Sequence, residues 1–265
     1  MRRGNTFMPR AAALAILLAG FAAAASATPT TITVKVLARG AKFIGSSMGG
    51  AMVTLRDADT GELLASGVTS GKTGDTEHIM KSEHPRNRVL STEGSAAFTA
   101  VLDLDRPRRI QVTAYGPLAN RASANTVSST QWVLPGRDIT AGDAWLLEMP
   151  GFAVQVLAPS THVKLPLRRS QGNTVHVQVE ANITMMCGCP LVPGDLWDSD
   201  TYEIRALVTR GGELVADLPM EYAGRASHFA AGLDVHERGT YLVTVTVFDP
   251  ATGNTGVGTT TFLVK

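Results

Sequence analysis

Both cysteines of the chain lie in one short stretch, residues 185–190, next to two methionines. A single glycine separates Cys187 from Cys189, and Met185 and Met186 precede them. Thiolate and thioether sulfurs are the ligands that Cu(I) prefers in proteins. Neighbouring side chains leave a strand in opposite directions, so only one of the two methionines is expected to join the cysteines. These residue types predict a soft-metal site for Cu(I).

A complete site would need a further ligand from another part of the chain, and Met220 and His228 are candidates by residue type. A structural zinc site is not predicted, because there is no second cysteine pair at the usual spacing.

A disulfide between Cys187 and Cys189 is the first alternative. In an extended strand their Cα atoms would lie about 6.6 Å apart, close to the upper limit of about 6.8 Å for a bridge. Closing so short a loop would stabilise the fold by only about 1.6 kcal/mol on the chain-entropy model. Such a bridge would contribute little to stability. A bridge of this kind is more typical of a redox-active or easily reduced cysteine pair.

A second alternative is that the sulfur stretch only fills space, with two small residues at a strand end and methionines in a core gap. An oxidising compartment argues against free thiols that no metal protects. A thiol–disulfide enzyme is less favoured, because its usual motif is Cys-x-x-Cys at a helix start. The metal, disulfide and packing interpretations all stay open from the sequence.

The polar segment at residues 70–92 contains a second metal candidate. Two Glu-His pairs, Glu77-His78 and Glu83-His84, recur six residues apart. Carboxylate and imidazole together can hold Zn(II) or Cu(II). The alternatives are a solvated polar loop or, because of Arg86, Asn87 and Arg88, a contact surface for an anionic group or another protein.

No catalytic set is predicted. Residues 45–49 match the G-x-S-x-G pattern of hydrolases, but that pattern requires a strand–turn–helix elbow. Here the glycines lead into residues 51–55, which have the alternation of a strand. The match is therefore interpreted as accidental, with the glycines allowing the chain to turn in a loop.

The N-terminus has the pattern of a secretion signal. Three arginines, Arg2, Arg3 and Arg10, precede the apolar run at residues 11–25, and residues 25–27 form an A-x-A cleavage signal that would leave Thr28 as the mature N-terminus. The run of about 15 residues is shorter than the roughly 20 needed to span a bilayer. Removing residues 1–27 would leave 21 basic and 23 acidic residues. This near-neutral charge does not indicate binding to nucleic acid. With the signal removed, we expect a periplasmic or secreted protein without a membrane span.

Short segments with period-two alternation follow one another through the rest of the chain, without a helical period. Residues 149–151 are the expected boundary between domains at 28–150 and 151–265. The pattern predicts an all-β protein with two antiparallel β-sandwich domains. The expected strands are residues 30–37, 51–56, 63–68, 96–102, 109–115, 130–134, 145–149, 152–157, 174–184, 202–208, 214–219, 226–233, 241–248 and 257–264.

Two family resemblances agree with this pattern. The strand–turn–strand around residues 57–62, Asp-Ala-Asp-Thr-Gly-Glu, resembles the opening of transthyretin-like and carboxypeptidase-regulatory-like modules, over residues 30–150. Residues 198–265 resemble a bacterial immunoglobulin-like domain, through Gly239-Thr240-Tyr241 and the alternating valines that follow. The resemblances imply β-sandwiches and carry no functional residues.

The sequence as a whole predicts an exported, non-enzymatic binding protein that handles copper as Cu(I) through the Met-Met-Cys-Gly-Cys motif. The alternative is an interaction module of an envelope or secreted assembly, with Cys187 and Cys189 oxidised. The expected partner in that case is another envelope or secreted protein.

Overall fold

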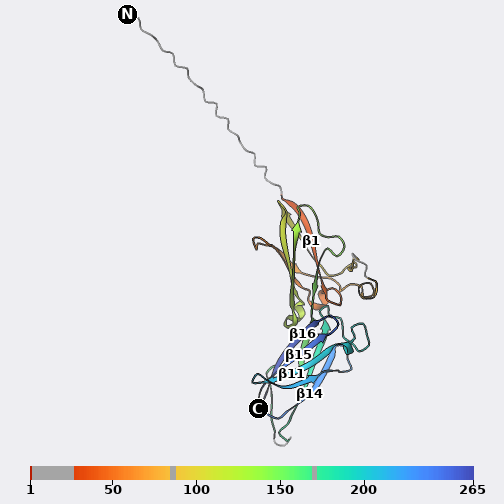
Figure 1. The fold of residues 1–265 in the computed structure, drawn as a ribbon, viewed down its shortest axis with the longest axis vertical. Helices are drawn as coiled ribbons and strands as arrows, with labels where there is room; N and C mark the ends of the chain where they lie inside the picture. Colours follow the sequence, from red (N-terminus) through yellow and green to blue (C-terminus); the bar gives the residue numbers. More distant parts are fainter. Residues whose placement is uncertain (2–26, 84–87, 169–171) are drawn as a thin grey trace.

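The computed structural model describes residues 1, 27–83, 88–168 and 172–265. The candidate ligand His84 lies outside these ranges, and so do Arg86, Asn87 and, from the expected signal segment, residues 2–26. The described chain is all-β, as predicted, and its strands form two groups of sheets that lie end to end along the long axis of the molecule (Figure 1).

Residues 28–149 build the first two sheets. The order β4-β1-β7 makes a three-stranded sheet, and β3-β2-β5-β6 makes a four-stranded one. Their bounds are β1 Thr28–Ala38, β2 Met52–Asp57, β3 Leu63–Val68, β4 Phe98–Leu104, β5 Arg108–Gly116, β6 Asn125–Val133 and β7 Trp145–Met149. Short helical turns, η1 Ser46–Met48, η2 Glu77–Lys81 and η3 Leu118–Ser123, interrupt the loops.

Residues 152–264 build the other two sheets, with the orders β13-β14-β10-β8 and β12-β11-β15-β16-β9. Most pairs are antiparallel, while β1–β7 and β9–β16 are parallel. The bounds are β8 Phe152–Ala158, β9 Val163–Leu165, β10 Val175–Met185, β11 Glu203–Arg210, β12 Glu213–Pro219, β13 Glu221–Tyr222, β14 His228–Val235, β15 Gly239–Asp249 and β16 Asn254–Val264, with the turn η5 Ser199–Thr201.

Alternation located the strands that have one buried face. In β10 the odd-numbered residues from Val175 to Met185 are buried, and the even-numbered residues between them are partly or fully exposed. The prediction was wrong at residues 125–129, because the expected strand began only at residue 130. Strand β6 begins at Asn125, and nearly all of its side chains are exposed. A strand with almost no buried side chain leaves no period-two hydrophobic signal.

One hydrophobic cluster runs through both groups of sheets, from Ile32 in β1 to Val264 in β16. The two groups therefore share a continuous core instead of being connected by an exposed linker. Within the described ranges, no helix is both long enough and apolar enough to cross a membrane.

The turn between β2 and β3 is organised by Asp57. One carboxylate oxygen accepts hydrogen bonds from the backbone N–H groups of Asp59 and Thr60, each at 2.9 Å. The bonds from Thr60 and Asp59, with a smaller contribution from the Arg108 guanidinium, hold the pKa of Asp57 below its usual 3.8. Hydrogen bonds of this kind favour the charged form, so the turn is most stable when Asp57 is ionised.

Replacing Asp57 with asparagine is expected to flatten the loss of stability in acid. A depressed folded pKa contributes stability that is present above the unfolded pKa and is lost as the pH falls through the folded pKa. Asparagine can accept the same two bonds but does not titrate in this range. Urea unfolding between about pH 5 and pH 2 would measure the slope for both proteins. Identical slopes would show that Asp57 makes no such contribution.

Candidate functional site at the junction of the sheets

The sulfur stretch forms a tight turn directly after β10. The Gly188 N–H donates to the Met185 carbonyl at 2.8 Å, and the Met185 N–H donates to the Cys189 carbonyl at 3.0 Å. Gly188 has a φ of 81°, a left-handed conformation that glycine adopts without steric cost. The turn brings the Cα atoms of Cys187 and Cys189 to 5.5 Å, and the two residues form a disulfide.

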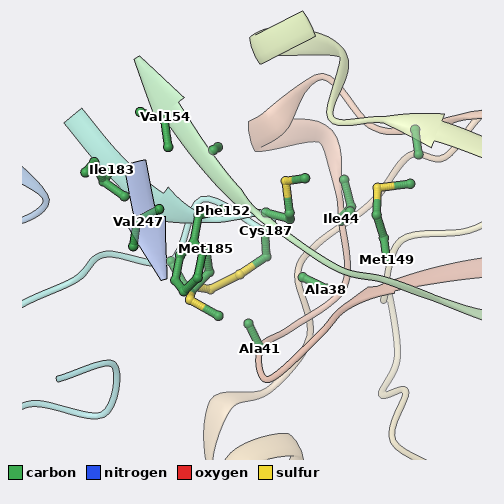
Figure 2. Packing of buried hydrophobic residues seen from close by; sticks show 14 of the residues in the cluster. Ala38, Ala41, Ile44, Met149, Phe152, Val154, Ile183, Met185, Cys187 and Val247 are labelled. Atoms are coloured by element: carbon green, nitrogen blue, oxygen red, sulfur yellow. A yellow bond between two sulfur atoms is a disulfide. The ribbon is translucent and has the colours of Figure 1, made fainter. Parts of the chain in front are cut away.

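The disulfide lies inside the hydrophobic core. Cys187 is 1% exposed and Cys189 is 5% exposed. Figure 2 shows the disulfide in a cluster with Met185, Phe152 and Ala41. Ala41 follows β1 and Phe152 begins β8, so the sulfur atoms lie where the two groups of sheets meet.

Met48 is a sulfur residue that the sequence did not link to this site. A Cβ placed on Gly188 would lie 2.8 Å from the Met48 sulfur, so this thioether packs directly on the turn. Met48 ends η1, well over a hundred residues before Gly188 in the chain. Only the fold brings the two together, and no local pattern could have identified the contact.

The candidate third ligands have their own contacts. The Met220 side chain is buried, and the backbone N–H of the same residue donates to the Ile204 carbonyl at 2.9 Å. His228 lies 2.7 Å from an Arg225 guanidinium nitrogen through Nδ1, and 3.3 Å from the Glu180 carboxylate through Nε2. In the ranges that the structure describes, no three His, Cys, Asp or Glu residues are placed to hold a metal ion together. A third ligand to the cysteines stays a prediction.

The second candidate loop forms a hydrogen-bond network of its own. The His78 Nδ1 is 2.9 Å from an Arg88 guanidinium nitrogen, which can only donate, so Nδ1 accepts. The Nε2–H then donates to the Val89 carbonyl at 2.9 Å. Glu77 pairs with Lys81 at 3.1 Å, and the Glu83 carbonyl accepts from Arg88. Both ring nitrogens of His78 are engaged, so a metal would have to displace one of these bonds.

Side chains from both groups of sheets hold the junction together. Asn254 of β16 accepts from the Gly151 N–H at 2.5 Å and donates to the Gly151 carbonyl at 3.1 Å. The Ser123 hydroxyl bonds to both the N–H and the carbonyl of Val154, at 2.8 and 2.9 Å. These bonds fix the backbone where β7 leads into β8.

A further hydrogen bond joins the two groups of sheets. The Trp197 indole N–H donates to the Gly40 carbonyl at 3.0 Å. The Met186 side chain fills the space beside Gly151, where an added Cβ would lie 2.5 Å from its terminal methyl group. The sequence did not identify Asn254, Ser123 and Trp197 as candidates. Each is a single polar or aromatic residue in a loop or strand, and it belongs to no recognisable sequence motif.

Burial predicts that the disulfide resists reduction while the protein is folded. Exchange requires direct attack on a sulfur atom, and neither cysteine is accessible without an opening of the core. An opening free energy of about 3 kcal/mol would slow reduction by about 100-fold relative to the unfolded chain. Timed alkylation and mass spectrometry in a phosphine reductant, with and without guanidinium, would compare the two rates. Equal rates would contradict the buried placement.

The comparisons with known proteins give only distant structural likenesses. No protein-family model and no curated protein sequence matches the chain. Solved structures that are similar include an engineered protein (18% identity, TM-score 0.31, covering 50% of this chain and 24% of that chain). They also include fibronectin(III)-like modules of CbhA from Clostridium thermocellum (11%, 0.28, covering 89% and 94%) and a chimeric titin Z1Z2 (13%, 0.24, covering 91% and 98%). The assignment of an all-β fold therefore rests on the observed sheets.

Proposed function

We propose that the protein is an exported, non-enzymatic interaction module, in which two β-sandwiches form one rigid body and the cysteine pair is oxidised and structural. The first sandwich, residues 28–150, is of the transthyretin-like kind, and the second, residues 151–265, is of the immunoglobulin-like kind. The partner is another envelope or secreted protein.

The observation that carries this proposal is the construction of the junction. The disulfide, Met186 and the hydrogen bonds of Asn254 and Trp197 all lie between the two groups of sheets. Two sandwiches held at a fixed angle lose little orientational freedom when a partner contacts both. A buried disulfide inside such a contact supports a structural part for the sulfur atoms.

Copper handling is a second candidate, and the position of Met48 favours it. Its thioether packs on the Cys-Gly-Cys turn, so a soft donor from a distant segment lies beside the cysteines. The disulfide would first have to be reduced, because the thiolate is the form that binds metal. Cu(I) binding therefore requires both reduction and an opening of the junction.

A thiol count on protein purified without reductant separates the two candidates. The interaction module is expected to show no free thiol, even after unfolding, and no bound copper. Competition for Cu(I) against a chelator, with Cys187→Ser as the control variant, completes the test. Two free thiols with bound copper, and weaker copper binding by the variant, would overturn the proposal in favour of copper handling.

A further inference from the structure

The sheet that contains the sulfur stretch has an incomplete edge. Strand β14 pairs with β10 along its whole length, from His228 to Val235. On its other side, the ladder to β13 covers only Phe229 and Ala230. Within the described residues, no further strand pairs with the rest of β14 on that side.

The direction of the free backbone groups follows from the hydrogen bonds that are present. The His228 carbonyl accepts from the Ala223 N–H on the β13 side. Alternate residues of an antiparallel strand direct both N–H and C=O to the same side. Gly232 and Asp234 therefore direct their backbone donors and acceptors to the open edge, while Leu233 directs its own to β10.

A groove follows this edge between the two sheets. A cavity of about 400 Å³ is lined by residues that include Leu218, Tyr222 and Gly232. A second cavity, of about 180 Å³, is lined by residues that include Val215 and Leu233. The opposite wall is β12, itself the edge of its sheet, and Val215 in it is 47% exposed. The groove thus presents apolar side chains, among them Leu218, Val215 and Leu233, together with polar groups beside an unpaired backbone.

The outer rim of the groove is acidic. Asp234 lies 2.5 Å from His176 across the outer face of the sheet. Glu221 lies on the rim and makes no ion pair within the described chain. Arg210 is the basic side chain of the lining, and it is paired with Glu237. With the histidines neutral, the lining has an excess of negative charge.

We propose that this edge binds an extended segment of a partner protein by β-strand addition. The added strand pairs with Gly232 and Asp234 through its backbone, as strands do at a free sheet edge. Its residues opposite Gly232 and Asp234 lie on the outer face, near Glu221, and are basic. Its alternate residues point inward to Leu233 and Val215 and are β-branched and apolar. This inference rests on the proposed interaction function and specifies the partner's binding segment.

A substitution that removes one backbone donor tests the proposal. In Gly232→Pro the outward N–H is lost while the β10 ladder keeps its bonds, because proline is compatible with an edge position whose N–H faces solvent. Gly232→Ala is the matched control, since an added Cβ would meet only the Gln178 side chain, at 3.9 Å. The probe is a blocked, fluorescent nine-residue peptide of alternating valine and lysine, with a valine–glutamate peptide as its charge control.

Fluorescence anisotropy on the full chain is expected to show binding of the lysine peptide by the parent and by Gly232→Ala. The Gly232→Pro variant is expected to bind about tenfold more weakly, the cost of one lost hydrogen bond and a blocked edge. Val215→Lys, on the other wall, is expected to weaken binding as well. The glutamate peptide is expected to bind more weakly than the lysine peptide.

Amide hydrogen exchange locates the contact. Peptide binding is expected to slow exchange at Gly232 and Asp234 more than at amides on the far edge, such as those of β8. No binding, or equal binding by the parent and Gly232→Pro, would overturn the proposed edge pairing. If the protein has no free thiol, a negative peptide result would contradict only the edge pairing and not the proposed interaction function. Free thiols with bound copper would contradict the interaction function itself, whatever the peptide result.

Discussion

Replacing Met186 with alanine is expected to lower the free energy of unfolding by about 3 kcal/mol. Met186 is fully buried and lies against Gly151 at the junction. The substitution removes several buried methylene and sulfur contacts, and surrounding backbone fixed by Asn254 cannot collapse into the space. Denaturant unfolding at neutral pH would measure the difference.

Met52→Ala is the matched control, because it is the same substitution on the outer face of β2, at a side chain that is 38% exposed. Its expected cost is about 0.5 kcal/mol or less. Similar losses for the two variants would mean that the space around Met186 is not a packed core.

Replacing Gly151 with alanine is the second change with a large expected effect, again about 3 kcal/mol. Gly151 has a φ of 125°, a conformation that side chains rarely adopt. An added Cβ would lie 2.5 Å from the Met186 terminal methyl group and 2.7 Å from the Asn125 side-chain nitrogen. Asn125 donates from that nitrogen to the Pro150 carbonyl at 2.8 Å, so moving aside would break a hydrogen bond.

Gly224→Ala separates backbone strain from crowding. Gly224 also has a positive φ, 77°, but an added Cβ would meet nothing within 4 Å. Its expected cost is about 1 kcal/mol. In a Met186→Ala background the crowding at Gly151 is partly relieved, so the second substitution is expected to cost less there than in the parent. Equal costs for Gly151→Ala in both backgrounds would show that Met186 does not crowd this position.

Strands with one buried face could be predicted from the sequence. In β10 and β15 the apolar residues alternate strictly, and that pattern follows directly from a pleated strand at a core. Strand β6 was missed from Asn125 to Ser129 because nearly all of its side chains are exposed, so no buried face imposes a period-two hydrophobic pattern on it.

The sulfur stretch could be located from residue types, but its surroundings could not. The cysteine spacing alone allowed a disulfide, a metal site or simple packing. The choice depends on Gly188 adopting a turn and on Met48 and Phe152 packing near it, and these contacts come from distant segments. The groove beside β14 could not be predicted from the sequence either. Whether a strand has an unpaired edge depends on which other strands pair with it, and a local pattern does not show this.

The most direct test of the rigid junction is the relative orientation of the two sandwiches in solution. Residual dipolar couplings of backbone amides would be measured for residues 28–149 and 152–264 in one weakly aligned sample. A rigid junction is expected to give a single alignment tensor, with the same magnitude and axes for both groups, when the couplings are fitted to the structure. Two tensors of clearly different magnitude would show that the sandwiches reorient independently, and the structural part assigned to the disulfide, Met186 and Asn254 would then be wrong.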